Sequence, residues 1–451
     1  MIAQSRAIYR ALVAAHPRTT LTAPITAVAV LAAVLALLAV VRWQPASAAP
    51  APEEAPREAA AVPWVPYTGI TFNWPIGDFN QRTIIVRRIH AAIDHTPAGE
   101  TIRIATYNLG LKASADKLIA AKRRGVKVQV IVNANLIGPL EARVQRAIGK
   151  NPNHSSFLFV CRDACRNSSP AGNMHLKIYS FTRTGTTKRL LISSSSNLGG
   201  PAMHGQWNDS VAIAGEVGLF STWWNLFDQM RHDRAYTPRR ITYVSDQMKA
   251  YFQRPVAGST SRVTTSKAIT DAPYVRLRDV SCNAPDGFGN AAGKTVITVN
   301  MRAWYGTRGE RLASLLALRK KYGCQVRVIG SLMSREVVRI LVGARIPVKA
   351  ADWEWGPRTS TSDPDKTVYG PSCYSHLKYV TVNGTYQGRG DRLVWTGSEN
   401  WSPPGLSSDE VTLELHGAQV TKTYNDMFVR MWNNGRVTHR VGIEPKYRPC
   451  A

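Results

Sequence analysis

The sequence predicts an α/β fold made of two similar tandem halves, and three observations lead to that prediction. A strand, helix and strand pattern occurs early in the chain and again late in it, and the two glycines that end the helices, Gly125 and Gly323, are 198 residues apart. The composition, with 44% hydrophobic and 19% charged residues among 451, is that of an ordinary globular protein. A chain of this length can bury large cores without help from disulfides.

The two copies of the pattern predict the same local structure. In the first, an apolar strand at 100–111 is followed by a helix that ends at Gly125 and by a second strand at 126–132. In the second, a strand at 294–301 precedes a helix that opens at Thr307 with capping-box spacing, and a strand at 323–330 follows. Each copy reads as a βαβ crossover, so we expect each half to contain a mainly parallel sheet flanked by helices.

In each half, a histidine and a lysine stand at the start of a short apolar strand. They are His175 and Lys177 in the first half and His376 and Lys378 in the second. Side chains two positions apart on a strand share one face, so each His and Lys should project together. A single pair of this kind would be unremarkable, but here the same pair recurs in both repeats.

A second strand follows in each half and ends in a small, polar cluster. Ser195 and Asn197 stand at the end of the first, and Ser398 and Asn400 at the end of the second. The chain therefore reads as a duplication, with a first half at 67–245, a polar junction at 246–275 and a second half at 276–447.

With these motifs in place, the chain resembles the phospholipase D superfamily, whose signature H-x-K-x4-D followed by G-S-x-N occurs twice. The resemblance covers nearly all of residues 67–445, and export would make it similar to the secreted bacterial type. It implies two phospholipase D-like halves related by a pseudo-twofold axis, with one shared active site. The matching residues are His175, Lys177, Ser195 and Asn197, and then His376, Lys378, Gly397, Ser398 and Asn400.

The chemistry of a phosphodiester explains these residue types. Hydrolysis needs a nucleophile for phosphorus, an acid for the departing oxygen and positive charge on the equatorial oxygens. The resemblance implies that His175 attacks to form a phosphohistidine and that His376 acts as general acid, with no metal ion or other cofactor. The groups expected to hold the nonbridging oxygens are Lys177, Lys378, Asn197 and Asn400.

Acidic residues after the Ser-x-Asn strands are candidates for a supporting role. A nucleophilic histidine needs an acceptor at its far ring nitrogen to fix the tautomer. The resemblance points to Asp209 in the first half and to Asp409 or Glu410 in the second. Acids that merely solvate a turn are the alternative for each of them.

The chain departs from the family signature at three places. Thr182 and Asn383 stand where the signature has Asp, and Ser194 replaces the glycine of the first G-S-x-N. Thr and Asn can still form local hydrogen bonds. The departures leave open a relative that binds an anionic lipid or polymer without catalysis.

The N-terminus predicts export. Basic residues precede an apolar run at 25–41, and the small residues of Ala46-Ser47-Ala48 follow. We expect a signal peptide at 1–48 and a Pro/Ala-rich linker at 49–66, with an uncleaved anchor through 25–41 as the alternative. The protein would then be secreted, or held at the membrane by this run.

Six cysteines agree with an oxidising compartment and allow three disulfides. Cys161 and Cys165 are close enough in sequence to pair and to fix the loop before His175. The alternative, a zinc site, lacks both a Cys-x-x-Cys pair and a suitably spaced His.

Charge indicates the class of partner. Lys and Arg number 57 against 30 Asp and Glu, a net charge of +27. Such a surplus favours anionic partners, although a basic coat that only aids solubility is the alternative. We expect a monomer that acts on a phospholipid or another anionic phosphodiester at a membrane surface. A secreted nuclease acting on nucleic acid is the competing function.

Overall fold

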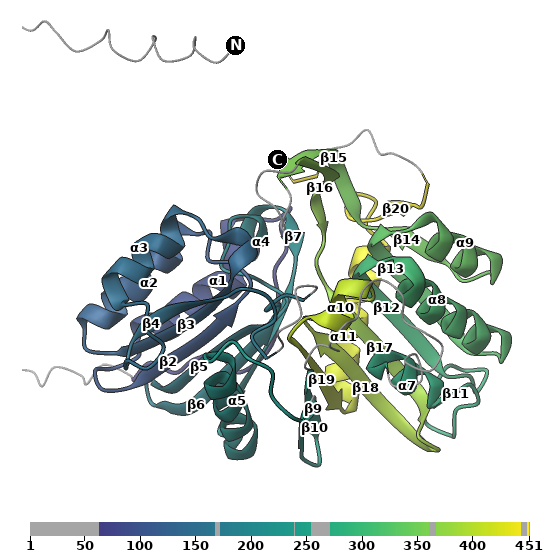
Figure 1. Ribbon diagram of the computed structural model, residues 1–451. Coiled ribbons are helices and arrows are strands. Elements are labelled where there is room, and N and C mark those ends of the chain that lie inside the picture. Colours follow the sequence, from purple (N-terminus) through teal and green to yellow (C-terminus); the bar gives the residue numbers. More distant parts are fainter. Residues whose placement is uncertain are drawn as a thin grey trace, which may run out of the picture. The chain divides into compact units, whose positions relative to one another are not determined.

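Two mixed β-sheets, each with helices packed on its faces, form the framework of the protein in the computed structural model (Figure 1). The structure describes residues 63–166, 172–238, 240–253, 271–359, 367–442 and 449–450, all within the compact unit Val62–Ala451. The expected signal peptide at 1–48, the alternative anchor at 25–41 and residues 49–62 of the linker lie outside the described residues. None of the helices in the described ranges is long and apolar enough to cross a membrane.

The first sheet has seven strands in the order β1-β8-β6-β5-β2-β3-β4. The bounds of these strands are Gly69–Phe72 (β1), Thr101–Thr106 (β2), Lys127–Asn133 (β3), Phe157–Cys161 (β4), Lys177–Thr184 (β5), Thr187–Ser194 (β6) and Asp209–Ala214 (β8).

The second sheet has ten strands, in the order β20-β14-β13-β12-β17-β18-β19-β10-β9, with β11 beside β17. Their bounds are Arg240–Val244 (β9), Met248–Gln253 (β10), Val280–Ser281 (β11), Val296–Trp304 (β12), Gln325–Met333 (β13), Val348–Ala350 (β14), Lys378–Tyr386 (β17), Arg389–Gly397 (β18), Glu410–His416 (β19) and His439–Arg440 (β20). A third sheet joins the two parts of the chain through β15 (Asp352–Thr359), β16 (Thr367–Ser375) and β7 (Gln206–Trp207).

The α/β class with helix-flanked sheets is confirmed, but the sheets are mixed rather than mainly parallel. Strands β2, β3 and β4 are parallel, and so are β12, β13 and β14. The strands that carry the two motifs, β5 with β6 and β17 with β18, are antiparallel. The reason is the short turn between them: only Gly185 and Thr186 join β5 to β6, which permits a hairpin but no crossover.

The expected boundaries of the junction need a correction. Strands β9 and β10 form a hairpin, and β10 pairs antiparallel with β19 along residues 248–253. Residues 240–253 therefore extend the second sheet instead of ending the first half or forming a linker. The alternating burial of Met248, Ala250 and Phe252 is the physical basis, since one face of this strand contributes to the core.

Helices cover both faces of each large sheet. Helices α1–α3 pack on one face of the first sheet and α5 packs on the other. On the second sheet, α7–α9 pack on one face and α11 packs on the other. Their bounds are Phe79–Asp94 (α1), Lys112–Arg123 (α2), Pro139–Ile148 (α3), Pro201–His204 (α4), Val217–Met230 (α5), Ala272–Arg278 (α7), Gly306–Lys321 (α8), Arg335–Gly343 (α9), Pro403–Ser407 (α10) and Ala418–Trp432 (α11), with a short 3-10 turn at Ala134–Leu136 (η1).

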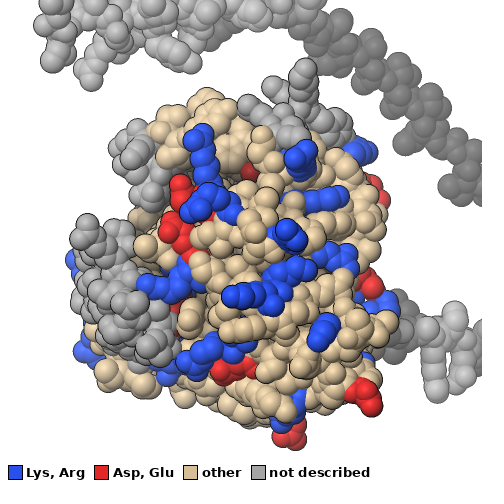
Figure 2. Space-filling view, turned by 90° about the vertical axis from the view of Figure 1, so that its right-hand side faces the viewer, with Lys and Arg blue, Asp and Glu red and all other residues tan. Residues whose placement is uncertain are grey.

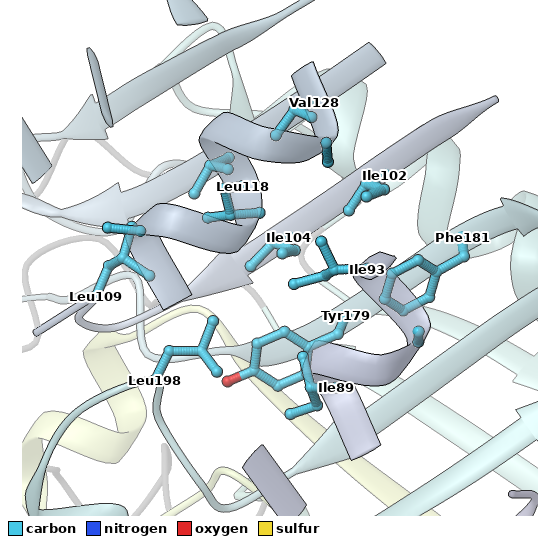
Figure 3. Close-up of a cluster of buried hydrophobic side chains, with 14 of the residues drawn as sticks. Ile89, Ile93, Ile102, Ile104, Leu109, Leu118, Val128, Tyr179, Phe181 and Leu198 are labelled. Carbon is cyan, nitrogen blue, oxygen red and sulfur yellow. The ribbon is translucent and has the colours of Figure 1, made fainter. Parts of the chain in front are cut away.

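Apolar residues at helical spacing explain how α1 and α2 dock on the first sheet. Figure 3 shows Ile89 and Ile93 of α1 and Leu118 of α2 beside Ile102 and Ile104 of β2, all of them buried. Helix α1 begins at a capping box, in which the side chain of Asp78 accepts from the backbone of Gln81 and the reverse bond is also present. The helix expected to open at Thr307 begins instead at Gly306, and its N-cap residue, Tyr305, makes no side-chain cap bond.

The two halves share buried cores. Trp223 and Phe227 of α5 lie in one cluster with Leu413 of β19, and Tyr424 of α11 lies in another with Trp74 of the first half. Burial of this kind is the dominant favourable term in folding. We expect the halves to unfold together for this reason.

Three disulfides join the six cysteines, as the count suggested. Cys161 pairs with Cys165, as expected, and the others are Cys282–Cys324 and Cys373–Cys450. The last of these ties the C-terminal end of the described chain to β16.

A buried carboxylate in the second sheet gives the first testable prediction. Glu414 accepts hydrogen bonds from Lys249, His416 and Trp395. Burial by itself would raise the pKa of Glu414, but these donors lower it to about 2 from the ordinary 4.5. Because the folded-state pKa is depressed, the stabilisation is present above the ordinary pKa and is lost as the pH falls toward 2.

We therefore expect Glu414→Gln to lower the free energy of unfolding at pH 7 by about 3 kcal/mol. The difference from wild type should shrink between pH 5 and pH 3. Urea unfolding at pH 7 and pH 3.5 measures both effects, and Glu336→Gln on the exposed side of α9 is the control. An equal difference at both pH values would contradict the prediction.

Candidate active site at the junction of the two halves

The main chain of each motif histidine is hydrogen-bonded to the opposite half. His175 N donates to the carbonyl of Asp409 at 3.1 Å, and His376 N donates to the carbonyl of Trp207 at 2.9 Å. The two bonds are equivalent, because Met174 pairs with Asp409 in the same parallel sense as Ser375 with Trp207. Each half therefore fixes the other's histidine.

A pocket of about 260 Å³ lies at this junction, and both histidines line it. Most of the lining is polar or aromatic, and both halves contribute to it. The lining includes Tyr107, His175 and Asn197 from the first half, and Arg302, Tyr374, His376, Asn400 and Glu410 from the second.

The far nitrogen of each histidine meets an acceptor from the other half. His175 Nδ1 lies 2.9 Å from Glu410 Oε1, and His376 Nδ1 lies 3.0 Å from Asn208 Oδ1. Both acceptors are oxygens, so each Nδ1 carries the proton and each Nε2 keeps its lone pair. One histidine is thus paired with a carboxylate and the other with a neutral amide.

The motif serines hold these acceptors in place. Ser398 Oγ donates to Glu410 Oε2, and Ser195 Oγ donates to Asn208 Oδ1 at 3.3 Å. Each motif serine therefore acts on the histidine of the opposite half through one intermediate residue. Neither serine lines the pocket, which agrees with a supporting role.

The motif lysines and asparagines complete the two equivalent sets. Lys177 Nζ donates to the carbonyl of His175 at 2.6 Å, and Lys378 Nζ donates to that of His376 at 2.5 Å. Asn197 and Asn400 line the pocket, and the Oδ1 of each is buried without a hydrogen-bond partner in the described part of the chain. These oxygens are acceptors, so a phosphate would bind the Nδ2 donors of the same two amides.

A family model described as "Cardiolipin synthase, PLD-like domain" matches residues 89–231, which include His175, Lys177 and Asn197. Residues 89–231 are thus similar to a phospholipase D-like domain. No curated protein matches the sequence.

Solved structures with a similar course of the chain include a phosphatidylserine synthase from Haemophilus influenzae Rd KW20, at 11% identity and a TM-score of 0.51, over 84% of this chain and 89% of that one. A polyphosphate kinase from Porphyromonas gingivalis matches over 84% of this chain at 13% identity and a TM-score of 0.47, and this chain spans 53% of the kinase. Nuc, a phospholipase D family member from Salmonella typhimurium, matches over 36% of this chain and 92% of that one, at 19% identity and a TM-score of 0.26. The similarity to the synthase shows a shared phospholipase D fold.

Burial sets the charge state of the two histidines of this phospholipase D-like site. It lowers the pKa of His175 to about 4, although Glu410 acts in the opposite direction. It also lowers the pKa of His376 well below the ordinary value, and there Lys378 and Arg302 reinforce the effect. Both imidazoles are therefore neutral at pH 7, as a nucleophilic nitrogen requires.

Burial also lowers the pKa values of the two motif lysines. Burial lowers the pKa of Lys177 to about 7, with Glu410 opposing and Arg302 reinforcing the shift. The pKa of Lys378 is well below its ordinary value because of burial and the nearby cations Arg302 and Lys177. An anion bound between the two lysines would restore their charge.

The expected acceptors divide into one that contacts a histidine and two that do not. Glu410 binds His175, whereas Asp209 accepts from Thr396 at 2.6 Å and from Tyr424 at 2.8 Å. Asp409 contributes its backbone carbonyl to His175, and burial raises the pKa of its side chain to about 7. The assignment of Asp209 and Asp409 as ring-nitrogen acceptors is therefore corrected.

Asn208 is the functional residue that the sequence reasoning missed. The backbone bonds of the motif serines, Ser195 N to Asp209 O and Ser398 N to Val411 O, make Asn208 the counterpart of Glu410. These backbone partners are known only from the structure, and a search of the sequence for acids passes over Asn208 because its side chain is an amide.

The departures from the signature lie away from the pocket. Thr182 Oγ1 donates to Glu100 at 2.6 Å and accepts from the backbone of Thr101. Asn383 exchanges hydrogen bonds with the backbone of Gly289. Both side chains bond locally and neither lines the pocket. In the described ranges no group of three His, Cys, Asp or Glu side chains could hold a metal ion.

Proposed function

We propose that the protein is an exported phosphodiesterase that hydrolyses a phospholipid through a phosphohistidine on His175. The observation that carries the proposal is the pairing of His175 Nδ1 with Glu410 in a pocket shared with His376. A carboxylate at Nδ1 keeps the proton on that nitrogen, which leaves the Nε2 lone pair free to attack. It also stabilises the positive charge that the ring gains when it bonds to phosphorus. His376, with an amide partner, is less suited to attack.

In the first step, His175 Nε2 attacks phosphorus and the bond to the head-group oxygen breaks. His376 gives that oxygen its proton, because the bound phosphate anion raises the pKa of His376, which burial and the neighbouring cations lower. In the second step His376 takes a proton from water, the water oxygen bonds to phosphorus and the bond to His175 breaks. The product is phosphatidic acid.

The amine and amide groups at the pocket would bind the nonbridging oxygens throughout. Lys177 and Lys378 supply charge, and Asn197 and Asn400 supply neutral donors. All of them come from fixed strand ends, so little reorganisation is needed during the reaction.

A phospholipid substrate is supported by the names of the similar proteins. The matching family model is described as a cardiolipin synthase domain, and a structural neighbour over 84% of this chain is a phosphatidylserine synthase. We propose that the protein acts as a monomer at a membrane surface after export, either released or held through residues 25–41. Lipid outside the cell would then be its substrate.

A secreted nuclease is the second candidate, and the distribution of charge favours it. Figure 2 shows Lys and Arg side chains over the face that α8 and α9 form. Between Gly306 and Arg345 the chain has nine Lys and Arg against Glu310 and Glu336, and all of the nine except the buried Arg308 are at least partly exposed. Such a surface suits a nucleic-acid backbone. A noncatalytic anion-binding protein is the third candidate.

One experiment separates the three functions. The mature protein is incubated in EDTA with phosphatidylcholine and phosphatidylglycerol vesicles and, separately, with plasmid DNA, with His376→Ala as the control. We expect phosphatidic acid to form and His376→Ala to abolish it. Nicking of DNA without phosphatidic acid would establish the nuclease. No turnover of either substrate, together with vesicle binding, would favour the noncatalytic protein.

A further inference from the structure

Besides Glu410 and Asn208, the pocket departs from its internal symmetry at a second charged position. Thr106 pairs with Lys177 on the neighbouring strand, and Met301 pairs with Lys378 in the same way. The next residue along each strand is therefore equivalent, and it is Tyr107 in the first half but Arg302 in the second. Both line the pocket.

Tyr107 serves the histidine of its own half. Its ring meets the edge of His175 with ring centres 5.3 Å apart, and Lys177 Nζ lies 5.3 Å from the ring centre. The Tyr107 ring thus makes an edge contact with the His175 ring and a cation–π contact with Lys177. The first half thus uses an aromatic ring where the second half places a guanidinium.

Arg302 has unused hydrogen-bonding capacity. Its guanidinium carbon lies 5.3 Å from the ring centre of Tyr374, and that ring meets the edge of His376 at 5.9 Å. Its Nε is buried without a hydrogen-bond partner in the described part of the chain. A buried guanidinium nitrogen without a partner is costly, so a ligand anion would satisfy it.

The charges on the two sides of the pocket are unequal. Lys177 stands on the His175 side together with the carboxylate of Glu410. Lys378 and Arg302 stand on the His376 side, where the acceptor of the ring nitrogen is the neutral Asn208. A phosphodiester brings a single negative charge that both lysines share, which leaves Arg302 uncompensated.

We propose that Arg302 forms an anion subsite for a second phosphate carried by the leaving group, so that the preferred substrate is a phospholipid with a phosphorylated head group. The inference rests on the proposed function and specifies its substrate. In-line attack by His175 puts the leaving group on the opposite side of phosphorus, where His376 and Arg302 stand. The phosphorylated head group leaves with the proton from His376 as its bond to phosphorus breaks. A choline head group, being a cation, would be repelled there.

The test compares two lipids that differ only by the second phosphate, phosphatidylglycerol and phosphatidylglycerophosphate, in mixed micelles. Phosphatidic acid is the product of both, so one assay gives kcat/KM for each. We expect wild type to prefer the phosphorylated lipid by about 10-fold or more, the effect of one charge-assisted contact. Arg302→Gln should lose the preference and Arg302→Lys should keep part of it. Arg339→Gln, on the exposed side of α9, is the matched control.

Calorimetric titration with inorganic phosphate and with pyrophosphate gives a readout that needs no turnover. We expect wild type to bind pyrophosphate about 10-fold more tightly than phosphate or better, and Arg302→Gln to bind both alike. Equal kcat/KM for the two lipids in wild type would overturn the subsite and leave the proposed function standing. If no lipid is turned over, the proposed function fails, and the calorimetric ratio alone then supports or overturns the subsite.

Discussion

His175→Ala is expected to lower phosphodiester turnover by at least about 1,000-fold, because it removes the nucleophile itself. The fold should persist, since Glu410 keeps the hydrogen bond from Ser398 and the backbone bond from His175 N to Asp409 does not involve the side chain. Initial rates of phosphatidic acid formation and a thermal melt measure the two effects. His154→Ala, an exposed histidine of the first half, is the matched control.

Trapping the intermediate in wild type and in His376→Ala assigns the attacking residue. Wild type quenched during turnover should carry acid-labile phosphate on the peptide that contains His175. His376→Ala should accumulate this species if departure of the head group can proceed without the acid. Phosphate found on the peptide that contains His376 would reverse the two roles.

Glu410→Gln is expected to reduce turnover by about 100- to 1,000-fold, because an amide no longer stabilises the charge on the phosphohistidine ring. The pH profile distinguishes this role from a merely structural one. Glu410 raises the pKa of His175 against the effect of burial, so its removal should move the acid limb of the rate profile to lower pH. A shift toward higher pH would contradict the assignment.

Asn208→Asp tests the role of the neutral partner of His376. It gives His376 a carboxylate partner and should raise the pKa of His376, so that the limb due to His376 moves to higher pH. Asp209→Asn is the control, since this neighbouring side chain bonds Thr396 and Tyr424 and touches neither histidine. An equal shift in both variants would show a general loss of packing instead.

The sequence predicted much of the framework, because strands and helices leave local patterns. The two βαβ units, the strands that begin at Lys177 and Lys378, and the pair Cys161 and Cys165 all follow from short-range periodicity and spacing. The direction of the strands was harder to predict from the sequence. The direction of β5 and β6 depends on a turn that periodicity does not describe, and the hairpin at 240–253 looked like a junction because its partner strand lies far along the chain.

By itself, then, the sequence determined the repeated motif and hence the residue types of the site, since the duplication places identical groups at equivalent strand ends. Only the tertiary structure decided which residue serves which histidine. Glu410 lies 235 residues from His175 and Asn208 lies 168 from His376, and each pair meets because the two halves pack against each other. The unequal charge at Tyr107 and Arg302 emerged in the same way. Such pairings depend on long-range packing, for which a local sequence pattern carries no signal.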